Sequence, residues 1–210
     1  MGINIRERTY QLDEVIHFQK NNEPYGELSN MSGLSLVVNG VLILTSEALY
    51  QVCKYPENQE AQLEIIAQKS PMAAKYKSRA YRQDVRADWN NVRVKVMRWC
   101  IRVKLAQNWD TFGNVLLSTE DRQIVELSKI DSFWGAKPVG NGQLRGENIL
   151  GRLLMELREE VKTKSPASLK EVVPLTIPDF VLFGSPIGMV SEDEKRRLFP
   201  DEPTQLELGI

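Results

Sequence analysis

The chain has 210 residues, 42% of them hydrophobic and 26% charged, so it is long enough to bury one sizeable core. Its 27 Lys and Arg residues against 28 Asp and Glu residues give a formal net charge of -1. This balance excludes a uniformly basic nucleic-acid coat protein and a strongly acidic disordered chain. The first residues are too polar for a signal peptide, and no window is apolar enough to span a membrane. We therefore expect a cytoplasmic protein with no membrane partner.

The cysteines and the histidine restrict the possible chemistry. Cys53 and Cys100 stand apart without C-x-x-C spacing, which predicts free thiols and disfavours a disulfide framework or a thiolate zinc site. A single histidine, His17, excludes His-rich metal sites, and its alternating neighbours predict that it packs at a strand edge. We therefore expect no metal ion or cofactor, and catalysis by carboxylates, lysine or tyrosine.

Taken in chain order, the patterns predict short strands first and helices afterwards. Residues 15–44 indicate strands around turns, with an Asn39-Gly40 hairpin. Helical periods then dominate to about residue 162. Breaks are expected at Pro56, Ser70-Pro71, Gly113 and 135–146.

Several helix boundaries and faces are predicted within that region. Ser70 is a good N-cap because Pro71 follows it, and residues 118–121 resemble a capping box that opens another helix. Apolar residues three or four apart predict a long amphipathic helix over 88–107 and a last strong helix over 148–162. The expected fold class is therefore mainly α, of the α+β type, with a few short N-terminal strands.

The C-terminal segment has a different composition. Six of the ten prolines lie beyond residue 163, so the helices cannot continue there. Apolar residues such as Phe180 and Ile187 are too frequent for a solvated tail. We expect a domain over residues 1–162 and an extended, proline-rich segment over 163–210 that packs on it.

Two stretches carry chemically useful groups near the start of the helical region. On a helix Glu47, Tyr50 and Lys54 stand at i, i+3 and i+7 and so share one face, although a solvated helix face explains the same pattern. The loop 25–30 presents short polar groups that suit sugar hydroxyls, or it is an ordinary turn connector.

A third stretch combines an aromatic pair with glycines. Residues 131–135 read Asp-Ser-Phe-Trp-Gly, and a glycine-rich run over 140–146 leads toward the helix that begins near Asn148. Backbone N–H groups before a helix suit a phosphate, and Trp134 offers a stacking surface for a base. A mobile surface loop is the alternative.

Basic residues are concentrated in one segment. Between Lys75 and Lys104 there are ten cations against two carboxylates, a local balance of +8 that leaves -9 elsewhere. This asymmetry favours a phosphate-bearing partner, including single-stranded DNA, unless the cations form a solvated helix face paired with neighbouring acids.

Taken together, these motifs resemble the NADAR family, also called YbiA-like, across residues 15–162. The resemblance rests on Y-G-E-L-S-N at 25–30, S-E-x-x-Y-Q-x-x-K at 46–54, D-W at 88–89, V-M-R at 96–98, D-S-F-W-G at 131–135 and N-I-L-G-R-L-L-M-E-L-R at 148–158. It implies a compact, mainly helical fold and metal-free N-glycosidase activity on ribosylated compounds. Ala48 and Ser78-Arg79 depart from the common pattern, as does the long loop after Gly135.

Hydrolysis of a ribose C1–N bond, whose transition state has oxocarbenium character, then suggests roles for individual residues. Glu47 would be the carboxylate near C1 of the ribose, Lys54 a nucleophile that forms a Schiff base, and Asp131 a second acid or base. The predicted ligand-binding residues are Gly26, Glu27, Ser29, Asn30, Tyr50, Arg79, Trp89, Trp134, Gly135, Asn148 and Arg152.

The expected partner is an ADP-ribosylated or phosphoribosylated substrate. We expect removal of ADP-ribose from guanine in DNA or nucleotides. Hydrolysis of phosphoribosylamino-pyrimidine intermediates of riboflavin biosynthesis and a non-catalytic ADP-ribose-binding module are the alternatives.

Overall fold

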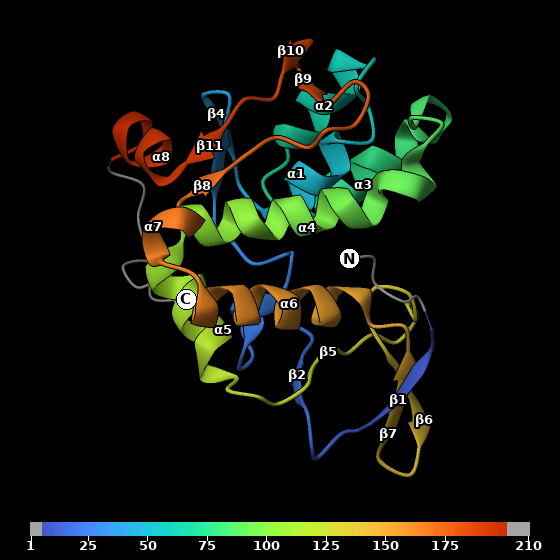
Figure 1. Cartoon of the computed structure of the whole chain (residues 1–210). Coiled ribbons are helices and arrows are strands. Elements are labelled where there is room, and N and C mark those ends of the chain that lie inside the picture. The colour runs from blue at the N-terminus through green and yellow to red at the C-terminus, as the bar shows by residue number, and fades with distance from the viewer. Residues whose placement is uncertain (1–5, 201–210) are drawn as a thin grey trace. The chain divides into compact units, whose positions relative to one another are not determined.

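A computed structural model of the chain describes residues 6–200, and these form two compact units, each built from two stretches of sequence (Figure 1). The first unit contains residues 6–29 and 110–165, and the second contains residues 30–109 and 166–200. The combination of helices with short strands is an α+β arrangement, which confirms the predicted fold class. Within the described residues, no helix is both long and apolar enough to cross a membrane.

The first unit combines two small sheets with helices. Strands β1, β7 and β6 form an antiparallel sheet in that order, whereas β2 pairs in parallel with β5. The elements of this unit are β1 (Arg8–Gln11), β2 (Ile16–Phe18), the 3-10 turn η1 (Gly26–Leu28), α5 (Asn114–Ser118), β5 (Ile124–Glu126), β6 (Lys137–Gly140), β7 (Gln143–Gly146) and α6 (Ile149–Thr163).

Helix α6 is amphipathic and packs against β5. Every apolar position that the sequence predicts to face inward is buried: Ile149, Leu150, Leu153, Leu154, Leu157 and Val161. The helix follows Asn148, whose backbone is left-handed at φ 49°. The Asn148 amide bridges to β5, because Nδ2 donates to the Ile124 carbonyl (2.8 Å) and Oδ1 accepts from the Glu126 N–H (3.1 Å). These bonds fix the start of α6 beside the strand.

The second unit is built around α4. Helix α1 packs against α2, α3 and α4, and the β3–β4 hairpin lies against α4. The elements are β3 (Leu36–Val38), β4 (Val41–Ile43), α1 (Ser46–Val52), α2 (Gln59–Ile66), α3 (Pro71–Ala80), η2 (Arg82–Asp84), α4 (Trp89–Gln107), α7 (Pro166–Leu169), β8 (Glu171–Val172), β9 (Val181–Leu182), β10 (Ser185–Pro186), β11 (Val190–Ser191) and α8 (Glu192–Leu198). A π-helical turn, η3 (Trp109–Gly113), leads from α4 to α5.

Local sequence signals explain several of these boundaries. The hairpin turn uses Asn39 (φ 50°) and Gly40 (φ 75°), which confirms the predicted turn and has the two positive φ values of a type I′ turn. The Ser70 hydroxyl accepts a hydrogen bond from the Ala73 N–H with Pro71 at the first helical position, as predicted. Ile16 and Phe18 are buried while His17 is exposed between them, which agrees with an alternating edge strand.

Residues 166–200 pack within the second unit. The Trp99 indole N–H donates to the Val173 carbonyl (3.0 Å), and the Phe180 ring meets the Trp99 ring edge-on at 4.9 Å between centroids. Gln62 also holds this segment, since its side chain bonds the backbone of Val181 and Phe183. The predicted domain boundary at residue 162 stays a prediction.

Two expectations about local structure are wrong. Residues 118–121 do not open a helix: α5 ends at Ser118, the buried Thr119 hydroxyl donates to the Leu116 carbonyl, and Glu120 is left-handed at φ 53°. A sequence that resembles an N-terminal capping box therefore lies at the C-terminal end of α5, because the Thr119 hydroxyl bonds a carbonyl three residues before it and not an N–H group that follows it. Likewise, residues 137–146 do not form a loop. They form the β6–β7 hairpin, with Asn141 (φ 51°) and Gly142 (φ 69°) in its turn.

Candidate active site

Two of the candidate catalytic residues belong to the second unit: Glu47 lies on α1, and Lys54 lies two residues beyond its end. Thr45 caps this helix by accepting the Ala48 N–H (3.1 Å), and every residue from Ser46 to Val52 is buried. Glu47 lies in the first turn, where the helix dipole favours a carboxylate, and is only 5% exposed. This burial rules out the alternative that Glu47 belongs to a solvated helix face.

Glu47 is held by two amide side chains. Oε2 accepts from Asn30 Nδ2 (3.0 Å), and Oε1 accepts from Gln51 Nε2 (2.7 Å). The Glu47 backbone N–H also donates to the Asn30 carbonyl (2.9 Å). Both carboxylate oxygens are therefore satisfied without a cation, and the carboxylate is fixed in one orientation.

Gln51 connects Glu47 to Lys54. Its Oε1 accepts from Lys54 Nζ (2.6 Å), so the amide lies between the carboxylate and the amine. Gln51 is part of the S-E-x-x-Y-Q-x-x-K motif, but no role was predicted for it. Its spacing of four residues from Glu47 was the available signal, since residues four apart meet on a helix.

The lysine is shifted toward its neutral form. The pKa of Lys54 is lowered to about 8, chiefly by burial; the charge of Glu47 opposes this shift, and the charges of Lys75 and Arg79 add to it. A neutral amine is the nucleophilic form, so this environment gives Lys54 a reactive fraction near neutral pH.

Aromatic rings enclose the amine. The Tyr50 and Trp89 ring centroids lie 5.0 Å apart, and Lys54 Nζ lies 5.6 Å from the first and 5.5 Å from the second. Burial, reinforced by the Glu47 charge, raises the pKa of Tyr50 far above its usual range, so the phenol stays protonated. A protonated phenol remains a hydrogen-bond donor.

The second unit thus brings together six of the predicted site residues: Asn30, Glu47, Tyr50, Lys54, Arg79 and Trp89. Arg79 is exposed at the end of α3 and lies over the Tyr76 ring, 5.0 Å from its centroid. The other eight predicted residues lie in the first unit: Gly26, Glu27, Ser29, Asp131, Trp134, Gly135, Asn148 and Arg152.

In the first unit, Asp131 shapes a tight turn. Its Oδ1 accepts the backbone N–H groups of Phe133 and Trp134, each at 2.9 Å. The Phe133 and Trp134 rings meet edge-on at 5.0 Å. One carboxylate oxygen of Asp131 is therefore used in the turn, and its role as acid or base stays a prediction.

Two predicted glycines are required by close backbone approach. A Cβ at Gly26 would lie 2.2 Å from the Asn21 carbonyl oxygen, and one at Gly135 would lie 2.3 Å from the Glu126 carbonyl oxygen. Only glycine fits at these distances. Asn148 is fully buried with both amide groups bonded to β5, so its side chain acts within the fold.

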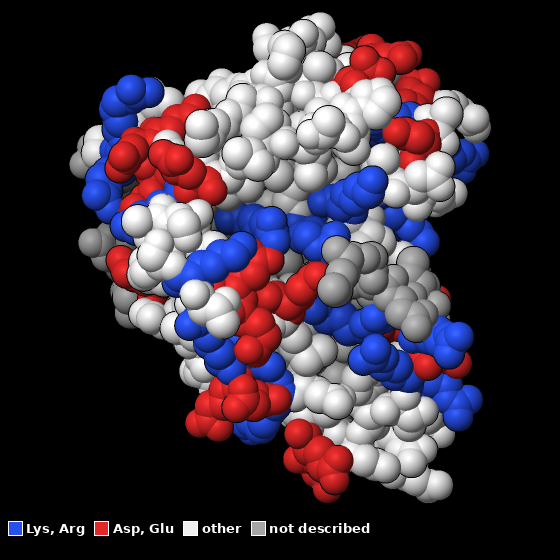
Figure 2. All heavy atoms as spheres, in the orientation of Figure 1, with Lys and Arg blue, Asp and Glu red and all other residues white. Residues whose placement is uncertain are grey.

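Several cations of the basic segment are engaged within the protein. Lys104 is only 1% exposed, and Lys77 pairs with Glu64 at 3.2 Å. Arg86 makes a bidentate pair with Asp88 and also donates to the Pro178 carbonyl (2.7 Å). Other Lys and Arg side chains remain visible along α4 in Figure 2. The segment is thus only partly a surface that can meet a phosphate.

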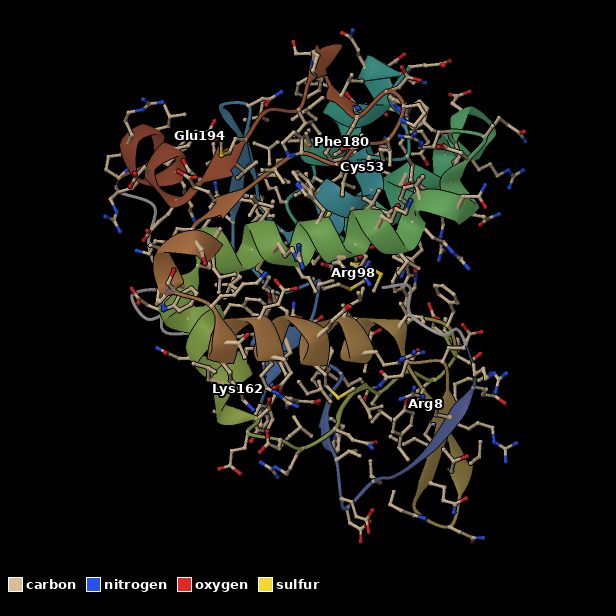
Figure 3. The ribbon with its side chains drawn as sticks, in the orientation of Figure 1. Arg8, Cys53, Arg98, Lys162, Phe180 and Glu194 are labelled. Atoms are coloured by element: carbon tan, nitrogen blue, oxygen red, sulfur yellow. The ribbon has the colours of Figure 1, made fainter. Side chains whose placement is uncertain are left out.

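The cysteines do not contribute a nucleophile. Cys53, labelled in Figure 3, and Cys100 are buried and free. Burial, and after it a hydrogen bond with Cys53, raises the pKa of the Cys100 thiol well above its usual range. Among residues 6–200, no three His, Cys, Asp or Glu side chains are grouped so as to hold a metal ion.

Comparisons with known proteins agree with the resemblance. The model of the NADAR domain matches residues 17–162. N-glycosidase YbiA of Escherichia coli K12 is 34% identical over 149 residues, which are 71% of this chain and 89% of YbiA. The NMR structure of E. coli YbiA matches with a TM-score of 0.62 and 33% identity, over 71% of this chain and 86% of that one.

A longer relative is also similar. A riboflavin biosynthesis protein of Vibrio vulnificus YJ016 is 34% identical over 166 residues, which are 79% of this chain but only 44% of that protein. This chain therefore spans less than half the length of that relative. The family model alone covers well over half of the sequence, and the chain belongs to the NADAR family.

Proposed function

We propose that the chain is an N-glycosidase that hydrolyses the C1–N bond of a ribose. The observation that carries this proposal is the Glu47–Gln51–Lys54 hydrogen-bond chain, which links a buried carboxylate on α1 to an amine with a lowered pKa just beyond the end of that helix. The similarity to proteins named N-glycosidase supports the same class of reaction.

The carboxylate suits the transition state of this reaction. Breaking a C1–N bond gives the sugar oxocarbenium character, so a fixed negative charge nearby lowers the barrier. Glu47 is oriented by Asn30 and Gln51 before any substrate arrives, so little reorganisation is needed during the reaction.

The amine suits a covalent step. Neutral Lys54 attacks C1, the C1–N bond breaks, and its electron pair goes to the leaving nitrogen, which takes up a proton. Opening of the ribose ring then gives an imine between Lys54 and C1. Water adds to C1, the C1–lysine bond breaks, and the free sugar and the amine are released. The sum is hydrolysis of one C1–N bond by one water.

We further propose ADP-ribose linked to guanine as the substrate. The Tyr50 and Trp89 rings beside Lys54, whose planes are tilted by 54°, offer aromatic surface for a flat base, and the exposed Arg79 nearby suits a phosphate. A phosphoribosylamino-pyrimidine is the second candidate, which the name of the relative from Vibrio vulnificus favours.

A substrate panel tests this proposal. The protein is incubated with ADP-ribosylated guanine in single-stranded DNA, with the corresponding free nucleotide and with a phosphoribosylamino-pyrimidine, and released sugar is measured. We expect turnover of the guanine compounds. Preference for the pyrimidine would establish the second candidate, and binding of ADP-ribose without release from any compound would make the protein a reader.

A further inference from the structure

A cluster of polar groups in the first unit is not explained by the proposed catalytic residues. It lies where β1 meets β7 and the start of α6. The Tyr10 hydroxyl and Glu147 Oε2 are both buried there without a hydrogen-bond partner. Buried polar atoms normally have a partner, so two such atoms in one place indicate a missing ligand.

The Tyr10 hydroxyl is not needed for packing. The ring belongs to a core cluster with Val125, Ala136 and Leu144, and the residue is only 4% exposed. A phenylalanine would fill the same space. The hydroxyl adds a desolvated donor that gains nothing from this core.

Two arginines lie at this cluster, Arg8 through the strand register and Arg152 through its place on α6. Arg8 and Tyr10 stand two residues apart on β1 and so share one face, and Arg8 pairs with Gly146, the residue before Glu147. Figure 3 labels Arg8 on β1. Arg152 lies on α6, five residues after Glu147. The pKa of Arg152 is lowered mainly by burial and also by the charge of Arg8, whereas Tyr10, Glu147 and Glu156 oppose this shift, so all of these groups lie near its guanidinium.

We infer that Arg8, Tyr10, Glu147 and Arg152 form a binding site for a phosphorylated sugar. The two guanidinium groups and the phenol donate to phosphate oxygens, and the open Glu147 oxygen accepts from a sugar hydroxyl. Of these residues, Arg8 and Tyr10 precede the part of the chain that matches the NADAR model. The choice of a sugar phosphate rests on the proposed function, whereas the site itself rests on the cluster.

Binding measurements test this site without requiring turnover. Calorimetry with the full chain compares ribose 5-phosphate, ADP-ribose and unphosphorylated ribose, and the first two distinguish a terminal phosphate from a diphosphate. Tyr10→Phe should weaken binding of a phosphorylated sugar by about tenfold, the effect of one hydrogen bond to a charged group, and leave the melting temperature unchanged or raised. Arg8→Gln should weaken the phosphorylated ligands by a similar factor.

Arg145→Gln is the matched control. Arg145 pairs with Thr9 on the opposite face of the same strands, so the variant loses the same charge and should bind normally. Wild-type binding by both Tyr10→Phe and Arg8→Gln, or loss of binding in Arg145→Gln alone, would overturn the inference. If the variants weaken binding while the wild type releases no sugar from any substrate, the site stands and the proposed glycosidase activity fails.

Discussion

At the scale of single residues, the candidate chemistry depends on side chains that meet from distant parts of the sequence, such as Asn30 and Trp89 around Glu47 and Lys54. The spacing predicted that Glu47, Tyr50 and Lys54 share one helix, and this is correct for Glu47 and Tyr50 but wrong for Lys54, which lies two residues beyond the end of α1 and reaches the helix through its bond to Gln51. The bond from Gln51 to Glu47 joins residues four apart on one helix, whereas the bond from Asn30 joins residues 17 apart and could not be predicted from local spacing. Burial, which shifts the Lys54 pKa, depends on packing by distant residues such as Trp89.

Replacing Glu47 by glutamine tests the role of the carboxylate. Glu47→Gln keeps the size of the side chain and removes its charge, so we expect the protein to fold and bind substrate while kcat falls by roughly 10²-fold or more. Glu57→Gln, an exposed carboxylate after α1, is the control. Steady-state kinetics decide, and normal turnover by Glu47→Gln would reject this role.

The pH dependence of the reaction tests Lys54. The amine is charged below its pKa of about 8 and neutral above it, so kcat/KM should rise with pH through that value and then level off. The Lys54→Arg variant retains a charge and should lose both the activity and the rising limb. A wild-type rate that stays constant over this range would show that a neutral lysine is not required.

At the scale of secondary structure, elements with strong local signals were predicted and those made by distant pairing were not. Helices α4 and α6 have long apolar stripes, and their positions agree with the sequence. The β1–β7–β6 sheet was missed because its strands are only four residues long and Tyr10 pairs with Leu144, far along the chain. Short strands carry too little alternation to be distinguished from loops.

The bridge from Asn148 to β5 gives an element-scale prediction. Asn148→Ala removes two hydrogen bonds to buried backbone groups and places alanine at φ 49°, so the free energy of unfolding should fall by about 2–4 kcal/mol. Asn141→Ala, at φ 51° in the exposed β6–β7 turn, has the same strain without these bonds. Urea unfolding should show the smaller loss for Asn141→Ala, and equal losses would mean that the bridge contributes nothing.

At the scale of the whole molecule, composition predicted the class of protein but not how its segments combine. The basic segment is offset partly by acids outside it, such as Glu64 for Lys77, so its net charge overstates the exposed charge. The proline-rich segment joins the second unit through backbone bonds to Trp99 and Gln62. Such pairings leave no periodic signal in the sequence.

Phe180 tests whether the C-terminal segment stabilises the second unit. Phe180→Ala removes a buried ring that packs on Trp99, so unfolding should become easier by about 3–5 kcal/mol. Met189→Ala, at a residue 57% exposed in the same segment, should change stability little. Similar urea midpoints for Phe180→Ala and the wild type would show that the segment is only loosely attached.

Trapping with borohydride during turnover tests the central claim, that Lys54 attacks C1 of the ribose, most directly. Reduction of the imine should leave one sugar adduct on the peptide that contains Lys54, detected by mass spectrometry. The adduct should be absent in Lys54→Arg and retained in Lys69→Arg, an exposed lysine outside the site. Sugar release by the wild type without any adduct, together with full activity of Lys54→Arg, would contradict the account.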